Sequence, residues 1–170
     1  MRVENNKKCY NITIMTFPTP HHDHSRCTES IVGHAEKTCA AKGARLTEQR
    51  RDVLVCVAES HAGVGAYDII ERMAAKGARP APITVYRALE FLQAHNLVHR
   101  IESRNAFVAC AEQHEGEPTA LLICESCGNV SEILERAAAD GLSAAARQQG
   151  FAVKHAVVEL SGICAHCGGA

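Results

Sequence analysis

Hydrophobic positions in the first half of the chain recur with the period of an α-helix in four segments. The second segment opens with Thr47 as the expected N-cap and places Val53, Leu54 and Val57 on one face. Two segments end at a glycine, which suits a helix C′ position, and Pro82 stands near the first turn of the fourth, where a missing N–H costs little. The four predicted helices span residues 30–43, 46–60, 66–77 and 80–96.

After Asn96 the period of the apolar positions changes from helical to alternating. The segments 97–103 ("LVHRIES") and 105–111 ("NAFVACA") are separated by a short Arg-Asn turn and predict a β-hairpin. Helices followed by a hairpin are the element order of a winged helix-turn-helix. We therefore expect a winged-helix domain over residues 30–111.

The second half of the chain predicts a small domain of helix and strand over residues 119–170, so the expected fold class is α+β. A polar stretch at 112–118 contains Gly and Pro and predicts a hinge. Residues 1–29 lack periodicity and are expected to form a disordered or variable tail, with a possible true start at Met15. The predicted elements of the second domain are strands at 119–124, 129–133 and 151–160 and a helix at 134–149.

Charge is distributed unevenly, although the formal net charge is only −1. Residues 31–105 carry eleven Lys/Arg against eight Asp/Glu, whereas residues 106–170 carry three against eight. A weakly basic first half suits contact with phosphate, and an acidic second half suits binding of cations. No apolar run approaches the length of a membrane span, and the N-terminus lacks the apolar run of a signal peptide, so we expect a cytoplasmic protein.

Two Cys-x-x-Cys pairs carry the clearest chemistry. A Cys-x-x-Cys turn presents two thiolates to one metal, and two such pairs complete a closed tetrahedral zinc site. A redox-active pair would explain one Cys-x-x-Cys motif but not two, so zinc binding is favoured. Redox thiols or a regulatory disulfide are the alternative. His34 and Glu36 match half of a zinc-deaminase motif, but four thiolates leave no open position for water, and no motif indicates an enzyme. The predicted zinc ligands are Cys124, Cys127, Cys164 and Cys167.

Six blocks of this sequence resemble, in order, the ferric uptake regulator family of metal-dependent repressors, and most of all its zinc uptake regulators. They are "RLTEQRRDVL", "AYDIIERM", "PITVYRALEFL", "LVHRIES", "FVAC" and "LLICESCGNVSE", and the resemblance covers about residues 35–167. It implies a homodimer whose C-terminal domain dimerises, a structural zinc on the two Cys pairs, and a second metal site at the hinge, about two zinc ions per subunit. It thus predicts a zinc-responsive repressor that binds double-stranded operator DNA and controls zinc uptake genes.

The predicted helix 80–96 is expected to be the recognition helix. Thr84 and Arg87 lie three residues apart on one face, and an arginine there can read guanine or hold a phosphate. Tyr67 matches a DNA-contacting position of the family, and Tyr86 stands beside Arg87. The alternative is that Arg87 forms a surface ion pair and the tyrosines belong to the core. The opposite face of the helix is expected to pack inward through Val85, Leu89 and Leu92.

A second metal site is expected at the hinge, where the family's zinc-sensing pattern has His, Cys, His and Glu. The third ligand has two candidates, because the family position falls nearer Glu117, whereas His114 is the only histidine of the linker. A mixed sulfur, nitrogen and oxygen set suits Zn²⁺, while a regulator of another metal such as iron is the alternative. A strand histidine or a buried cysteine is, taken singly, more often structural. The predicted ligands are His99, Cys110, His114 and Glu132.

Other histidines and cysteines have weaker interpretations. His155 matches an additional metal site of some family members, but the usual partners are missing from the wing, so we expect a structural role. The "HHDH" stretch at 21–24 is expected to bind metal only adventitiously. Cys39 and Cys56 are expected to be core thiols, whereas Cys9 and Cys27 receive no role.

Overall fold

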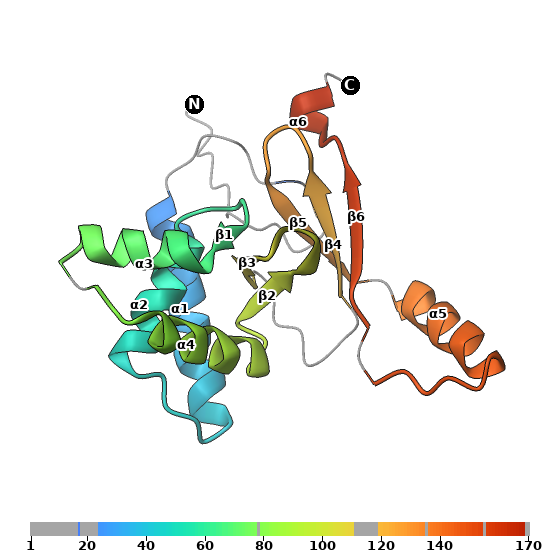
Figure 1. The fold of residues 1–170 in the computed structure, drawn as a ribbon, viewed down its shortest axis with the longest axis horizontal. Coiled ribbons are helices and arrows are strands. Elements are labelled where there is room, and N and C mark those ends of the chain that lie inside the picture. Colours follow the sequence, from blue (N-terminus) through green and yellow to red (C-terminus); the bar gives the residue numbers. More distant parts are fainter. Residues whose placement is uncertain are drawn as a thin grey trace, which may run out of the picture.

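The computed structural model describes residues 17, 24–77, 79–110, 119–134, 136–154 and 156–168. Its helices are α1 His24–Ala41, α2 Glu48–Ala58, α3 Ala66–Ala75, α4 Pro82–Ala94, α5 Arg136–Gln148 and α6 Ala165–Gly168, with a 3-10 turn, η1, at Glu102–Arg104. Its strands are β1 Val64–Gly65, β2 Val98–Ile101, β3 Ala106–Ala109, β4 Thr119–Cys124, β5 Val130–Leu134 and β6 Val158–Gly162. Helices α1 to α4 gather beside β1 to β3, and a separate sheet carries α5 on its far side (Figure 1). The α+β fold class is confirmed.

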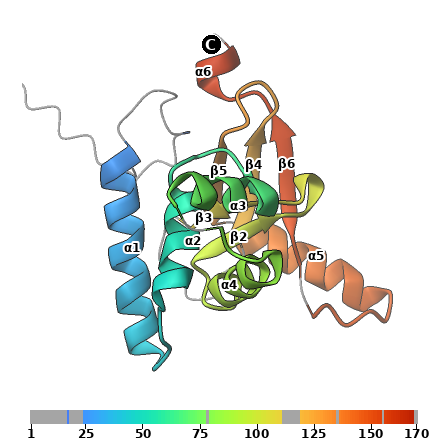
Figure 2. The same cartoon turned by 60° about the vertical axis from the view of Figure 1, so that its left-hand side comes forward.

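The four N-terminal helices pack around one aliphatic core, with α1 lying along α2 (Figure 2). Thr47 caps α2, since its side-chain oxygen accepts a hydrogen bond from the backbone N–H of Arg50 at 3.4 Å. Pro82 occupies the first turn of α4, as predicted. Both predicted apolar stripes face the core, and their side chains are at most 1% exposed: Val53, Leu54, Val57, Val85, Leu89 and Leu92.

Each half of the chain contributes one three-stranded sheet. The first has the order β1-β3-β2 and is antiparallel, with the predicted hairpin closing at Asn105, whose φ of 47° is left-handed. The second has the order β5-β4-β6, in which β4 pairs antiparallel with β5 and parallel with β6. No helix in the described ranges is long and apolar enough to cross a membrane.

An apolar cluster joins the two sheets. Its buried side chains come from the wing hairpin on one side and from β4 and β5 on the other: Ile101, Ala106, Val108, Leu121, Ile123 and Val130. The backbone also crosses this junction, because Ala62 forms an antiparallel bridge with Asn129. The predicted hinge 112–118 lies outside the described residues, so the domain boundaries stay a prediction.

Two elements begin six or more residues away from their predicted starts. Helix α1 begins at His24 rather than at residue 30, because Cys27 and Ile31 continue its buried face by one further turn. Strand β6 begins at Val158 rather than at residue 151, since strand length is set by pairing and β4 meets only Val158–Gly162. Strand β1 and helix α6 were not predicted, because segments of two and four residues are too short to show a period.

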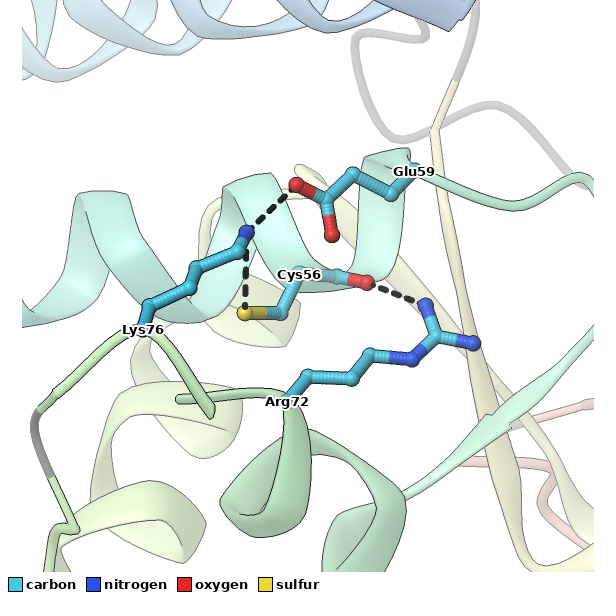
Figure 3. Close-up of polar contacts among 4 residues, drawn as sticks. All are labelled: Cys56, Glu59, Arg72 and Lys76. Atoms are coloured by element: carbon cyan, nitrogen blue, oxygen red, sulfur yellow. Dashed lines mark hydrogen bonds and ion pairs between the residues drawn. The ribbon is translucent and has the colours of Figure 1, made fainter. Parts of the chain in front are cut away.

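Polar contacts fix α3 against the end of α2 (Figure 3). Arg72 donates a hydrogen bond to the backbone carbonyl of Cys56 at 2.9 Å, which satisfies a carbonyl in the last turn of α2. Lys76 pairs with Glu59 and lies 4.0 Å from the sulfur of Cys56. Burial raises the pKa of Cys56, so this thiol stays protonated and packs as a small apolar group.

Candidate metal centres and DNA-facing surface

The fold brings the four predicted sulfur ligands together. Cys124 ends β4, and the parallel register places it opposite Gly162, the last residue of β6, two residues before Cys164. The four sulfur atoms lie within 4.8 Å of one another, and those of Cys127 and Cys164 are 3.9 Å apart. The 36 residues between the two pairs form β5, α5 and β6 and return the chain to the first pair.

The backbone beside Cys124 favours the thiolate form of that side chain. Hydrogen bonds from the backbone N–H groups of Cys127 and Cys164 lower the pKa of Cys124 to about 6, whereas burial raises the pKa of Cys127 to about 12. Gly128 has a φ of +77°, which lets the chain turn back after the second sulfur. Four thiolates in this arrangement match Zn²⁺ and leave no open coordination position.

Three of the four predicted hinge ligands also meet. His99 lies on β2, Cys110 directly follows β3, and Glu132 lies on β5, so the ligands come from both sheets. Glu132 Oε2 is 3.6 Å from His99 Nε2 and 3.6 Å from the sulfur of Cys110. Cys110 and Glu132 are buried, and the ligand atoms lie within 4.8 Å of one another. His114 and its alternative Glu117 lie outside the described residues.

A buried carboxylate beside a thiol and an imidazole fits a cation. Burial disfavours each charge taken alone, and a divalent ion would offset the charges of the thiolate and carboxylate. Nitrogen, sulfur and oxygen donors together suit Zn²⁺, whereas all-oxygen sites suit Mg²⁺ or Ca²⁺. The arrangement is suited to linking the wing to the second sheet through an ion.

Glu159 makes a second polar link between the halves. Its carboxylate accepts hydrogen bonds from the backbone N–H groups of Glu102 at 2.6 Å and Ser103 at 3.2 Å, at the tip of the wing. Burial acts to raise its pKa, but these bonds, a side-chain bond from Ser103 and the charge of Arg104 outweigh burial and lower it. The carboxylate therefore holds the tip of the wing against β6.

Glu159→Gln is expected to destabilise the folded protein only while Glu159 is ionised. A carboxyl whose folded pKa is depressed contributes stability above its unfolded pKa and loses it as the pH falls through the folded value. The difference from wild type, under about 1 kcal/mol for an exposed contact, should be present at pH 7, shrink once the pH falls below the ordinary glutamate pKa of about 4.3, and vanish below the depressed folded pKa. Urea denaturation across this pH range measures it. Glu125→Gln, on an exposed residue, is the control, and a difference that does not change with pH would contradict the prediction.

The predicted DNA-contacting residues lie on an accessible surface of α3 and α4. Tyr67 is 69% exposed and Tyr86 is 37% exposed, so the alternative that places these tyrosines in the core is wrong. Arg87 is exposed and Thr84 is half-buried at the start of α4. Among the described residues no ion pair involves Arg87, which leaves its guanidinium available for an external anion.

A third group of potential ligands was not predicted. His24 and Cys27 on the first turn of α1 meet His61 in the loop after α2, with ligand atoms within 4.8 Å of one another. The signal in the sequence was the spacing of His24 and Cys27, which places both on one helix face, but nothing local indicates that His61 joins them.

The other histidines and cysteines singled out in the sequence belong to the helix surface or the core, or lie outside the described residues. His34 lies 3.3 Å from Thr38 and Glu36 pairs with Arg51, which fits the expected helix surface rather than a deaminase site. Cys39 is buried, as Cys56 is, and both are core thiols as predicted. His155, Cys9 and residues 21–23 of the "HHDH" stretch lie outside the described residues.

Comparisons with known proteins agree with this geometry. A model of the ferric uptake regulator family matches residues 41–161. The zinc uptake regulation protein of Escherichia coli (strain K12) is 37% identical over 141 residues, which cover 82% of each chain. A zinc uptake regulator solved in complex with zinc and DNA is 36% identical with a TM-score of 0.77, over 82% of this chain and 93% of that one. Holo XcZur is 37% identical with a TM-score of 0.76, over 83% and 99%.

Proposed function

This chain belongs to the ferric uptake regulator family, and we propose that it is a zinc-responsive transcriptional repressor that binds operator DNA as a homodimer. The observation that carries the proposal is the meeting of His99, Cys110 and Glu132, because their elements come from both sheets. The similarity to a zinc uptake regulator solved with zinc and DNA supports the metal and the nucleic acid. Genes for zinc uptake are the proposed targets.

About two zinc ions per subunit are proposed, with different roles. The four-cysteine site is closed and holds the end of the chain to β4, so its zinc is structural. The hinge site has three described ligands and a fourth from the linker, for which His114 or Glu117 is proposed. Zinc at this second site is the signal.

Zinc at the hinge would act by selecting one arrangement of the two halves. An ion bound by His99, Cys110 and Glu132 favours the arrangement in which these ligands converge. The shift in the equilibrium equals the difference between the ion's binding free energies for that arrangement and for the others. Shifting an equilibrium from 1:99 to 99:1 needs a preference of about 10⁴-fold, which a site with several ligands can supply. The selected arrangement sets the separation of the two recognition helices in the dimer.

The C-terminal elements offer the surface for dimerisation. Helix α5 has no buried residue among those described, and β6 pairs on one edge only. Large apolar side chains are exposed on these elements and the segments beside them, at 38–65%: Leu142, Phe151, Val153, Val157, Leu160 and Ile163. Exposed apolar area of this kind, continuous with a free sheet edge, is typical of an obligate interface.

DNA is proposed to meet the start of α4 and Tyr67. A recognition helix enters the major groove with its N-terminal part, where Thr84, Tyr86 and Arg87 lie. In a two-fold dimer the half-sites are spaced by about one helical turn of DNA or a multiple of it. The weakly basic first half of the chain agrees with contact to phosphates.

Arg87→Ala is expected to lower affinity for the operator by about 10- to 100-fold, which corresponds to about 1–3 kcal/mol for a lost base or phosphate contact. The operator is first selected from random-sequence DNA by the zinc-loaded protein, and affinity is then measured by fluorescence anisotropy. Zinc content and dimer mass should stay at wild-type values. Lys37→Ala, which removes one positive charge from the exposed side of α1, is the matched control. Equal operator affinity of Arg87→Ala and wild type would remove this residue from recognition.

A further inference from the structure

The cluster of His24, Cys27 and His61 has the geometry of a metal site. His24 and Cys27 lie three residues apart on the first turn of α1, so both side chains project from the same face. His61 approaches from the loop between α2 and β1, and Figures 1 and 2 show this loop beside the start of α1. The imidazole centroids of His24 and His61 are 4.8 Å apart, and the rings are tilted by 43° rather than stacked.

The three side chains are held in a sheltered place. Cys27 is fully buried, His61 is 7% exposed, and the Nδ1 atom of His24 has no access to solvent. The loop carrying His61 is fixed on both sides, since Ser60 Oγ accepts from the N–H of Ala62 at 3.1 Å and the carbonyl of His61 accepts from the N–H of Val130 at 2.9 Å. Ligands on a fixed loop and a helix lose little freedom on binding.

Two imidazoles and one thiolate form a donor set for Zn²⁺. Tetrahedral zinc separates such ligand atoms by about 3.3–3.8 Å, given bond lengths of about 2.0–2.1 Å to nitrogen and 2.3 Å to sulfur. The ligand atoms lie within 4.8 Å of one another, so rotations of the three side chains would have to shorten the longest separation by about 1–1.5 Å. We propose that His24, Cys27 and His61 bind a third Zn²⁺, with the fourth coordination position taken by water or one further donor.

The proposed site lies where the two halves of the chain touch. The backbone of His61 bonds to Val130, and Ala62 bridges to Asn129. Along the chain, Asn129 and Val130 lie between Cys127 of the four-cysteine site and Glu132 of the hinge site. Zinc at the third site therefore ties α1 to the loop that contacts the start of β5, and it stabilises the junction on which the hinge site is built.

Two of the three proposed ligands lie outside the part of the chain that the family model matches, and His61 lies within it. That match begins at residue 41, whereas His24 and Cys27 precede it. The alternative role for these residues is simple packing, in which Cys27 fills the core as a small apolar group. Zinc counting distinguishes the two roles, and it does so independently of the proposed function.

The first experiment counts zinc in the full-length protein by native mass spectrometry at saturating zinc, with a weak chelator present to remove adventitious ions. Cys27→Ala and His24→Gln are each expected to hold one zinc ion fewer per subunit than wild type. Cys39→Ala, which removes a buried thiol from the same helix, should hold the wild-type number. His24 is half-buried, so its variant tests the site even if Cys27→Ala folds poorly. Wild-type zinc counts in both ligand variants would overturn the proposal.

A second experiment uses Cys110→Ser as the background, in which the hinge site lacks its thiolate. With the four-cysteine site filled by zinc, added Co²⁺ should still give a sulfur-to-cobalt charge-transfer band, which the proposal assigns to Cys27. The band should disappear in the double variant Cys27→Ala/Cys110→Ser, and its absence from the single variant would overturn the site. Hydrogen exchange at the amide of Val130 should be slower in zinc-loaded wild type than in zinc-loaded His24→Gln. Equal exchange would refute the link to the junction.

Discussion

Cys124→Ser is expected to abolish binding of the structural zinc, to disorder the second sheet and to dissociate the proposed dimer. Apparent binding free energies of structural zinc sites are about 10–16 kcal/mol, and this energy contributes directly to folding. Beyond the apolar cluster that the second sheet shares with the wing, little replaces this energy, because α5 buries none of its described residues and, within the described ranges, β6 pairs only with β4. Zinc content, sedimentation mass and protection of β4 amides from hydrogen exchange measure the three effects.

The helical half should survive this change. Its core is formed by α1 to α4 and the wing, and it contains none of the four sulfur ligands. Cys39→Ala is the matched control, since it removes a buried thiol from that core and should leave the structural zinc and the dimer in place. A Cys124→Ser protein that keeps the full zinc count and dimer mass would refute the structural role of the four-cysteine site.

The sequence predicted the features that depend on local spacing. Each Cys-x-x-Cys pair is a local unit, and the change from helical to alternating apolar positions after Asn96 predicts the order of helices and hairpin. The stripe of Val85, Leu89 and Leu92 is likewise a local period, and these side chains are buried. Resemblance to the family added the hinge ligands, which no spacing rule connects.

The features that the sequence did not predict depend on long-range contacts. The sequence predicted one strand over residues 151–160, but β4 offers partners only to Val158–Gly162, so β6 begins at Val158 and Phe151 is exposed. The group of His24, Cys27 and His61 forms only because α1 lies along α2 and brings its first turn to the loop beyond. Helix packing of this kind leaves no local signal at His61.

Cys110→Ser is expected to abolish zinc-dependent DNA binding while the structural zinc and the dimer are retained. The sulfur of Cys110 is buried, 3.6 Å from Glu132, and no other described thiol is near the hinge site. Removing a residue that only orients a ligand typically costs about 10- to 100-fold in metal affinity, so loss of the ligand itself should exceed this range. The zinc concentration that gives half-maximal operator binding is the quantity to measure.

The same variant separates zinc from iron as the signal. A thiolate favours zinc, whereas an iron-responsive site would depend chiefly on histidine and carboxylate ligands, so Cys110→Ser should leave an Fe²⁺ response largely intact. Operator binding is therefore titrated with Zn²⁺ and, under anaerobic conditions, with Fe²⁺, for wild type and variant. Cys56→Ala controls for loss of a buried thiol remote from the hinge. If wild type responds to Fe²⁺ alone, or if Cys110→Ser keeps the wild-type response to Zn²⁺, the proposal that His99, Cys110 and Glu132 bind the signalling zinc is wrong.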